Sequence, residues 1–432
     1  MIIKVVKKVL LGITIAMFPS EMGAQITLEE CQRLARENYP LLRRYDLITQ
    51  STEYNIENIS KGYLPQISAV AQASYQSDVP SLPDALTNMM SLNGYDPKGM
   101  RKDQYRIGLN IDQLVWDGGN IKARKNLTQS QDATEKARVE VDLYALRSRI
   151  NDLYFGILLI DEKIKLNAEL QTLLQANYEK LETMNKGGIA MKCDVDLMRA
   201  EYLNACQQYT QLETMRESYV AMLAIFISRP IEAINKLQKP ETQMPESMVI
   251  NRPEMRLFDA QLQYTHCQEE LLNSSFKPRV SLYAQGYYGY PGYNMFNDMI
   301  SHDWSLNGII GVRVAWNIGS FYTKKTDKNR LALSRENIEN RRDVFVFNNN
   351  IQSTQLLKVI SQYETVLKQD DDIISLRKDV RMSSESRLNH GVIDVNNLLQ
   401  DITRENQACI NKTIHEVELL RNIYNLKYTI NQ

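Results

Sequence analysis

The sequence predicts an α+β membrane protein that consists of two copies of one structural unit. Three patterns support this prediction: an internal duplication, four alternating segments with the length of membrane strands, and two long proline-free segments with heptad spacing of apolar residues. The 432 residues are 43% hydrophobic and 24% charged, which indicates neither a disordered chain nor an all-apolar bundle of spanning helices.

The duplication is visible without gaps when residues 38–75 are aligned with residues 251–288. Twelve of the 38 aligned positions are identical. We therefore interpret residues 25–230 as a first structural repeat and residues 231–432 as a second.

The N-terminus has the layout of a secretory signal peptide over residues 1–24. Three lysines precede an apolar run from Val9 to Phe18, and small and polar residues follow it. No later segment offers the roughly 18–20 uninterrupted apolar residues of a spanning helix. A mature chain that crosses a bilayer must therefore cross it as strands.

The first helix of the mature chain is predicted by the capping box Thr27-Leu-Glu-Glu30, and Pro40 interrupts it. Four alternating segments, each of about ten residues, are predicted strands at about 66–77, 103–116, 279–290 and 304–317. Tyrosine and tryptophan gather toward the strand ends, which is typical of outer-membrane barrels. The residues between the first two strands, rich in Pro, Asn, Gly and Ser, are predicted to form a loop.

Each repeat then continues into a long helix, predicted at about 119–185 and 319–388, and a return helix at about 194–228 and 394–430. In the first long helix a strict 3-4 spacing marks a coiled-coil seam, formed by Leu143, Leu146, Ile150, Leu153, Ile157, Ile160 and Ile164. The second long helix repeats the stripe with Leu356, Ile360, Tyr363, Leu367 and Ile374, and Asp370 falls on it without an explanation.

Two kinds of turn stand out as candidate functional positions. At the far end of each long helix a glycine stop and an aspartate restart predict a hairpin tip, with the candidate residues Gly187, Gly188, Asp194, Asn389, Gly391 and Asp394. At each passage from strand to helix an aromatic anchor and glycines recur, with the candidate residues Trp116, Gly118, Gly119, Trp316 and Gly319. We expect Gly319 to serve the second junction as Gly118 and Gly119 serve the first.

Four strands cannot form a closed membrane barrel, since about eight is the least observed and open edges in lipid leave backbone groups unpaired. Three copies would supply twelve strands, an even number in the usual range. The chain must therefore oligomerise to insert, and the long helices would then extend the same closed wall out of the membrane.

At this point the chain resembles the TolC-type outer-membrane efflux proteins. The resemblance lies in five stretches in family order: ITLEECQRLARENYPLL at the mature start, YLPQIS and FKPRVS before strands, LVWDGGNIKARK at a junction and GGIAMKCDVDLMRAEY at a tip. It implies a homotrimer in outer-membrane lipid, with a trimeric 12-stranded outer-membrane β-barrel of four strands per chain that continues into a long periplasmic α-helical coiled-coil barrel. It also implies an exit duct for a tripartite pump or a type I secretion system that serves an inner-membrane transporter, with a periplasmic adaptor (membrane fusion) protein at the tips.

Members of this family often carry acidic rings about ten residues before the second tip, which suggests a possible gate at Asp379, Arg381 and Glu385. This sequence departs from that pattern, because Arg381 stands at the position itself while Asp379 and Glu385 flank it. The chemistry of the gate therefore stays open at this stage.

The sequence gives little support to an enzyme. It contains none of the patterns GxGxxG, GxxxxGKS, GxSxG or HExxH. We expect no cofactor and no metal, the four histidines at the surface or the tips, Asp370-Asp371-Asp372 on a solvated helix face, and the five cysteines unpaired in helices. The formal net charge of −1 does not favour a nucleic-acid partner.

One rival to the duct is a soluble periplasmic coiled-coil scaffold without a barrel. It would account for the signal peptide and the heptads. It gives no purpose to the four strands or to the two junctions.

Overall fold

The computed structural model describes residues 26–97, 99–230 and 237–431, so the predicted signal peptide lies outside the described residues. Contacts divide the chain into two units. We call residues 40–142 and 251–349 the strand unit, and residues 1–39, 143–250 and 350–432 the hairpin unit. The predicted α+β fold, with four antiparallel strands and long helices, is confirmed.

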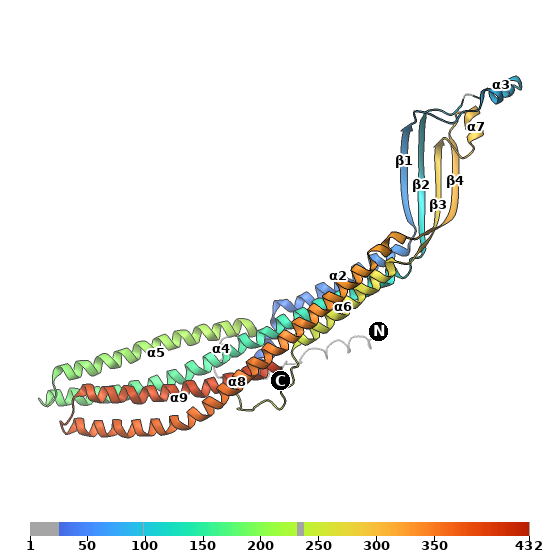
Figure 1. The fold of residues 1–432 in the computed structure, drawn as a ribbon. Coiled ribbons are helices and arrows are strands. Elements are labelled where there is room, and N and C mark those ends of the chain that lie inside the picture. The colour runs from blue at the N-terminus through green and yellow to red at the C-terminus, as the bar shows by residue number, and fades with distance from the viewer. Residues whose placement is uncertain (1–25, 98, 231–236, 432) are drawn as a thin grey trace, which may run out of the picture. The chain divides into compact units, whose positions relative to one another are not determined.

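The strand unit contains one four-stranded antiparallel sheet in the order β1-β2-β3-β4 (Figure 1). Its strands are β1 (Gln66–Tyr75), β2 (Asp103–Trp116), β3 (Arg279–Tyr290) and β4 (Ser305–Ala315). Because neighbours in sequence pair throughout, β1 and β4 form the two edges of the sheet within this chain.

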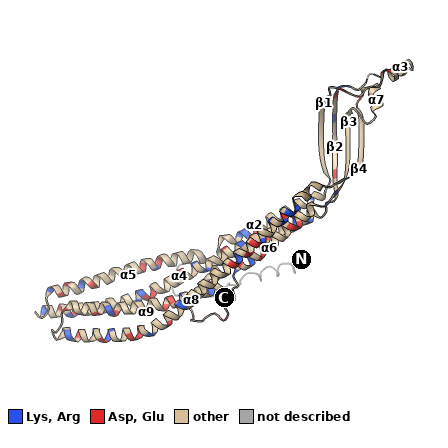
Figure 2. Ribbon diagram, viewed as in Figure 1, with Lys and Arg blue, Asp and Glu red and all other residues tan. Residues whose placement is uncertain are grey.

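The two faces of the sheet differ in chemistry. Directly opposed residues share a face, so the registers Ile67 with Ile111 and Ala284 with Ile310 build one apolar surface. The other face is polar: Arg106 bonds Gln72, and other paired polar side chains follow along β2 and β4. Figure 2 shows how few charged residues the strands carry compared with the helices.

The two connections at one end of the sheet are tied to each other. The Tyr290 hydroxyl accepts from the Arg101 backbone N–H at 3.0 Å and donates to the Asp298 carbonyl at 3.0 Å. The second connection holds α7 (Met295–Ile300), and the first holds α3 (Asp84–Leu92). The prediction of a plain loop there is incomplete, because Pro83 and Asp84 supply a helix start inside it.

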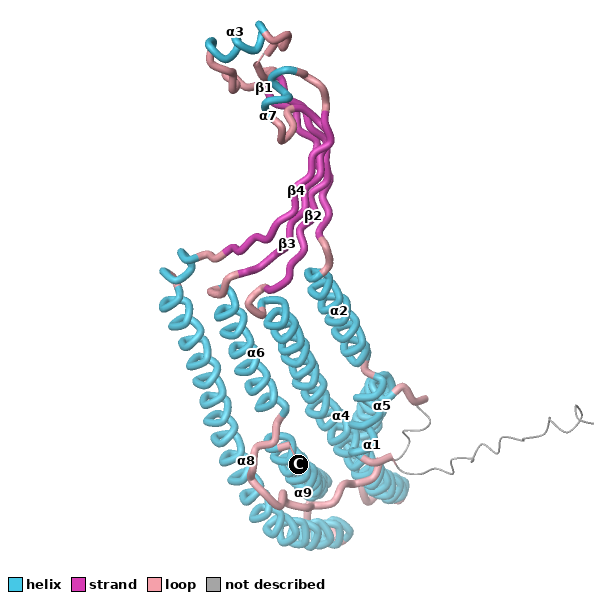
Figure 3. Tube along the Cα trace, turned by 90° about the vertical axis from the view of Figure 1, so that its right-hand side faces the viewer, coloured by secondary structure: helices cyan, strands magenta, loops and turns pink. Residues whose placement is uncertain are grey.

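Helices pack side by side in the rest of the strand unit (Figure 3). They are α2 (Arg43–Ser60), preceded by η1 (Pro40–Leu42) and followed by η2 (Lys61–Tyr63), then α6 (Pro253–Ser275), and the first parts of α4 and α8. One link is the Thr134 hydroxyl on α4, which donates to the Ala260 carbonyl on α6 at 3.3 Å. Pro253 stands in the first turn of α6, where its missing N–H costs nothing.

The hairpin unit consists of two antiparallel helix pairs and one short helix. Its helices are α1 (Leu28–Asn38), the later parts of α4 (Asn120–Lys186) and α8 (Lys324–Asn389), and the return helices α5 (Lys192–Ile227) and α9 (Val395–Ile430). Both return helices have 36 residues and end at a residue in the left-handed conformation, Ser228 and Asn431. No helix of the described residues has the length and apolar composition needed to span a bilayer.

The apolar seam of α4 is buried as its spacing predicts. Leu143, Leu146, Ile150, Ile157 and Ile160 are all at most 4% exposed, and the other two seam positions are half-buried. Each buried side chain of this size contributes about 1.5–3 kcal/mol through the hydrophobic effect. The seam therefore supplies much of the free energy that keeps a 67-residue helix in place.

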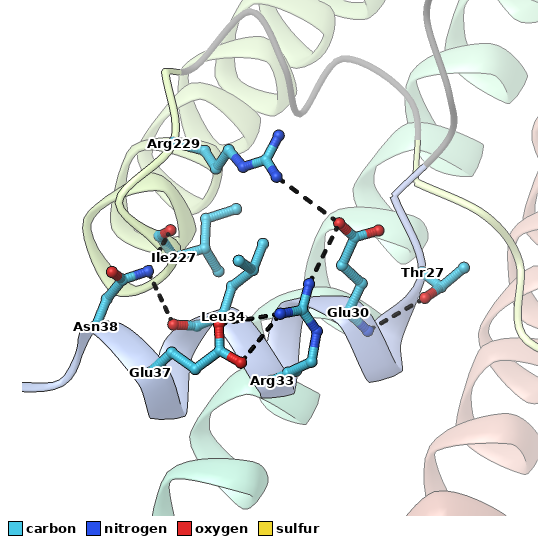
Figure 4. Close-up of polar contacts among 8 residues, drawn as sticks. All are labelled: Thr27, Glu30, Arg33, Leu34, Glu37, Asn38, Ile227 and Arg229. Carbon is cyan, nitrogen blue, oxygen red and sulfur yellow. Dashed lines mark hydrogen bonds and ion pairs between the residues drawn. The ribbon is translucent and has the colours of Figure 1, made fainter. Parts of the chain in front are cut away.

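Helix α1 fixes one end of this unit (Figure 4). The Asn38 amide donates to the Leu34 carbonyl at 2.9 Å and to the Ile227 carbonyl at 3.0 Å, so it caps α1 and α5 together. At the other end of α1 the Thr27 hydroxyl accepts from the Glu30 N–H at 3.2 Å, which confirms the predicted start of the helix.

The prediction that the cysteines are unpaired residues of helices is confirmed. Cys31 lies on the buried face of α1 beside Ile150 and Tyr154. Burial, together with nearby Glu30 and Glu29, raises the pKa of the Cys31 thiol to about 12. Cys193, near the start of α5, is exposed.

We expect N-ethylmaleimide at pH 8 to modify Cys193 and to leave Cys31 unmodified. The thiolate is the reactive form, and a pKa of about 12 leaves on the order of 10⁻⁴ of Cys31 as thiolate at that pH. Peptide mass spectrometry of the folded protein measures both rates. Equal labelling of the two cysteines would contradict the packing of α1.

Candidate functional sites at the junctions and the helix tips

The first junction depends on glycine backbone conformation and on one buried carboxylate. Gly118 and Gly119 have φ of 71° and 88°, and a Cβ on Gly118 would lie 2.5 Å from the Lys277 Cβ. Asp117 is 4% exposed and accepts from the N–H groups of Gly119 at 2.9 Å and Ile121 at 2.6 Å. Asp117 therefore satisfies free donors at the start of α4, a role that the sequence analysis missed.

The second junction is built differently. Gly319 lies inside η4 (Ile318–Tyr322) and has no positive φ, so the expectation that it repeats the role of Gly118 and Gly119 is wrong. A turn of 3-10 helix makes the passage instead. Trp316 is held there, because its indole N–H donates to the Phe276 carbonyl at 2.9 Å.

The two helix tips have the same turn. At the first tip the Gly188 N–H donates to the Asn185 carbonyl at 2.9 Å, and the Ile189 N–H donates to the Met184 carbonyl at 2.9 Å. At the second tip Gly391 and Val392 make the equivalent bonds, at 3.0 and 2.9 Å, to carbonyls of the last turn of α8. These are Schellman motifs, in which the φ values of 75° at Gly188 and 69° at Gly391 favour glycine.

The other candidate residues at the tips have unequal roles. Asp394 is the N-cap of α9 and accepts from the Asn397 N–H at 2.8 Å, whereas Asp194 lies in the first turn of α5 and accepts from the Met191 N–H at 3.2 Å. Gly187 and Asn389 are exposed residues at the ends of the long helices, and Gly187 has no positive φ. Each tip also presents an apolar side chain to solvent.

These apolar side chains are Ile189, which is 76% exposed, and Val392, which is 63% exposed. Single exposed apolar residues are common, but here they occupy the same position of the same turn in both repeats. The tips are therefore matched in backbone and in exposed chemistry.

Arg381, a candidate gate residue, lies in an ionic cluster between α8 and α9. Its guanidinium bonds Glu405 of α9 and, at 2.6 Å, Glu385 of its own helix, and its side chain is only 12% exposed. Burial acts to lower the pKa of Arg381, but the hydrogen bonds with Glu405 and Glu385 outweigh it and raise that pKa. Asp379 is exposed and lies outside the cluster.

Further polar links join α8 to α9 on either side of Arg381. The Ser384 hydroxyl donates to Asp401 at 2.7 Å, and the Lys412 ammonium donates to Asp371 at 2.7 Å. The bond to Asp371 raises the pKa of Lys412. The closer a residue of α8 lies to the tip, the closer to the tip is its partner on α9. This order is the one that an antiparallel hairpin requires.

A further link between α8 and α9 joins Asp370 to His415. It corrects two expectations from the sequence, that Asp370 lies on a solvated face and that His415 lies at the surface or a tip. Asp370 is 6% exposed, not on a solvated face, and its carboxylate lies 2.7 Å from Nδ1 of His415. His415 is half-buried and contacts the Tyr363 ring. The position of Asp370 on the apolar stripe was a usable signal for an inward carboxylate, but its partner lies 45 residues away on the return helix.

The geometry does not suggest a metal centre. Within the described residues, no group of three or more His, Cys, Asp or Glu side chains is arranged to hold a metal ion. At the first junction Asp117 bonds to backbone groups, and on α8 Asp370, Arg381 and Ser384 bond to side chains of α9.

A four-stranded sheet with one apolar face, continued through two junctions into two helical hairpins, defines the fold class of this chain. A scan against protein-family models and a search of curated proteins each find no match. Solved structures match over 93% of the chain. They include the outer-membrane channel OprN, with a TM-score of 0.67, 14% identity and 89% of its chain covered.

Two further matches are the CmeC outer membrane channel of Campylobacter jejuni and the MtrE outer membrane channel of Neisseria gonorrhoeae. CmeC has a TM-score of 0.64, 14% identity and 85% of its chain covered, and MtrE has 0.62, 14% and 88%. This chain therefore has the fold of the TolC-like outer-membrane channels, as its resemblance to that family predicts.

We expect Arg381→Gln to loosen the second hairpin near its tip. The change leaves the Glu405 carboxylate, itself largely buried, without its guanidinium, at a cost of about 1–3 kcal/mol. Hydrogen exchange of residues 378–408 should accelerate accordingly. Arg377→Gln removes an exposed guanidinium from the same helix and should leave exchange unchanged; equal effects of the two variants would contradict the role of the cluster.

Proposed function

We propose that this chain is a subunit of an outer-membrane exit duct. As a homotrimer it passively conducts substrates to the outside from an inner-membrane transporter and a periplasmic adaptor protein, in a tripartite efflux pump or a type I secretion system. It lies in the outer membrane, extends into the periplasm and has no catalytic role. The fold it shares with OprN, CmeC and MtrE supports this proposal.

The observation that carries the proposal is the exposed apolar face of the sheet. Ile67, Leu306 and Ile310 are 66%, 82% and 81% exposed in the single chain, and their neighbours on that face are also apolar. Such a contiguous patch is costly in water and marks a surface that contacts lipid or another protein. Outer-membrane strands present this kind of face to lipid.

The edges of the sheet support a trimer. β1 and β4 each have one side without a paired strand in this chain, and open edges are not tolerated in lipid. If β4 of one copy pairs with β1 of the next, three copies close a barrel of twelve strands.

Helix α8 supports contact between copies as well. Besides its contacts within the chain it carries exposed apolar side chains at 3-4 spacing, in two runs: Val344, Phe347 and Ile351, then Ile373, Leu376 and Val380. A second apolar stripe at this spacing is the surface on which another helix packs in a coiled coil. A neighbouring copy is the partner that a closed helical barrel provides.

The decisive experiment is fractionation followed by conductance. The mature protein should enter the outer membrane, resist extraction by salt and carbonate, and run as a trimer by mass. Purified trimer should produce discrete conductance steps in a planar bilayer. Recovery as a soluble periplasmic protein would support the coiled-coil scaffold instead and would end the proposal of a duct.

The tips should be required for export and dispensable for insertion, because adaptor contact is proposed there. The double variant Gly188→Val and Gly391→Val places a β-branched residue at a positive φ in each tip. Each substitution destabilises its turn by about 1–2 kcal/mol and distorts it. We expect export of a fluorescent pump substrate to fall tenfold or more, with trimer in the membrane unchanged.

The matched control is Lys180→Val, which puts the same side chain at an exposed position of α4 about two turns before the tip, where φ is not positive. The control should keep at least half of the export. Full export by the double variant would remove the tips from the proposed contact with the adaptor.

A further inference from the structure

A small cavity lies in the hairpin unit between α4, α5 and α9, which run alongside one another there (Figure 1). Its volume is about 250 Å³, slightly below the roughly 300–1,000 Å³ of pockets for drug-sized ligands, so it suits a smaller molecule. Lys163 is the one charged residue among the described residues that line it. The cavity is remote from the tips, since Lys163 lies 25 positions before Gly188, roughly 37 Å at the rise of an α-helix.

The Lys163 ammonium has no carboxylate to pair with at the cavity. Positions three and four residues away on its own helix are Leu159, Ile160, Leu166 and Asn167, and none of the residues that line the cavity from α5 or α9 is acidic. The side chain is half-buried. A partly desolvated cation without a counter-charge creates a preference for an anion.

A second group at the cavity has unused hydrogen-bonding capacity. Asn167 is 6% exposed, and its carbonyl oxygen accepts from the Gln171 amide at 2.7 Å. Its own amide group donates only to the Gln208 side chain, at 3.5 Å, which is the outer limit of a hydrogen bond. Buried donors normally have a good partner, so this amide N–H is free to donate a hydrogen bond to a ligand oxygen at little cost.

The rest of the wall is largely apolar. Leu212, Met215 and Ile410 line it, and the flexible thioether of methionine adapts to ligands of varied shape. The cavity therefore combines a cation and an amide donor with an adjacent apolar wall. This combination is complementary to an amphipathic anion. A neutral apolar molecule would leave Lys163 and Asn167 unsatisfied, and an organic cation would be repelled.

We propose that this cavity binds a small amphipathic carboxylate, such as a medium-chain fatty acid. The carboxylate accepts hydrogen bonds from the Lys163 ammonium and the Asn167 amide, and the alkyl chain contacts Leu212, Met215 and Ile410. The site is separate from the proposed duct activity, so a chain that fails to conduct ions would still bind the ligand.

The test measures binding of radiolabelled octanoate to the full-length protein in phospholipid nanodiscs, with empty nanodiscs subtracted. We expect saturable binding at one site per chain. Lys163→Gln should weaken it tenfold or more, and Lys163→Arg, which keeps the charge, should restore most of it. Lys165→Gln, which removes an exposed lysine of the same helix that does not line the cavity, should change affinity less than twofold.

Octanamide serves as a ligand control, because it has the shape of octanoate without the charge. It should compete at least tenfold more weakly than unlabelled octanoate. Three results would each overturn the proposal: uptake that does not saturate, equal affinities of the Lys163→Gln and Lys165→Gln variants, or equal competition by octanamide. Unchanged circular dichroism of the variants shows that any loss of binding is local.

Discussion

The structure depends on backbone hydrogen bonds that one chain cannot complete. The sheet has four strands, one apolar face and two edges, at β1 and β4, whose outer N–H and C=O groups have no partner within the chain. In water such edges invite aggregation, and in lipid each unpaired group costs several kcal/mol. Pairing between copies, which we propose, would satisfy these edges while the apolar face contacts lipid.

Each repeat contributes two strands and one helical hairpin. Every strand joins a helical segment at one end of the sheet and leads into a connection or turn at the other end. The first junction makes the passage with two glycines at positive φ and the buried Asp117, and the second makes it with a 3-10 turn held by Trp316. Two different local solutions therefore serve one position in the fold, which is possible because both deliver a helix start after a strand end.

Local patterns in the sequence predicted the four strands and the long helices, but not the contacts between them. Alternation at Ile67, Ala69 and Ala71 predicts a one-sided strand, because side-chain direction depends only on period. The buried link between Asp370 and His415 depends instead on the register of α8 against α9, which no local pattern encodes. Gly319 shows the opposite failure, in which residue type suggested a conformation that the surrounding turn does not adopt.

The two long helices also differ in the kind of side chain that packs them against their neighbours near the tips. Between residues 361 and 389, all of which the structure describes, the fully buried positions of α8 are Asp370 and Ser384, and both are polar. The corresponding part of α4 buries one polar residue, Asn167, but also Leu174 and Leu181, which lie in an apolar cluster with α5 and α9. Withdrawal of α8 from α9 in this stretch would release polar groups that water can solvate, whereas withdrawal of α4 would expose apolar surface at about 25 cal/mol per Å². In this stretch α8 is therefore held to α9 by polar links that include the Arg381 cluster.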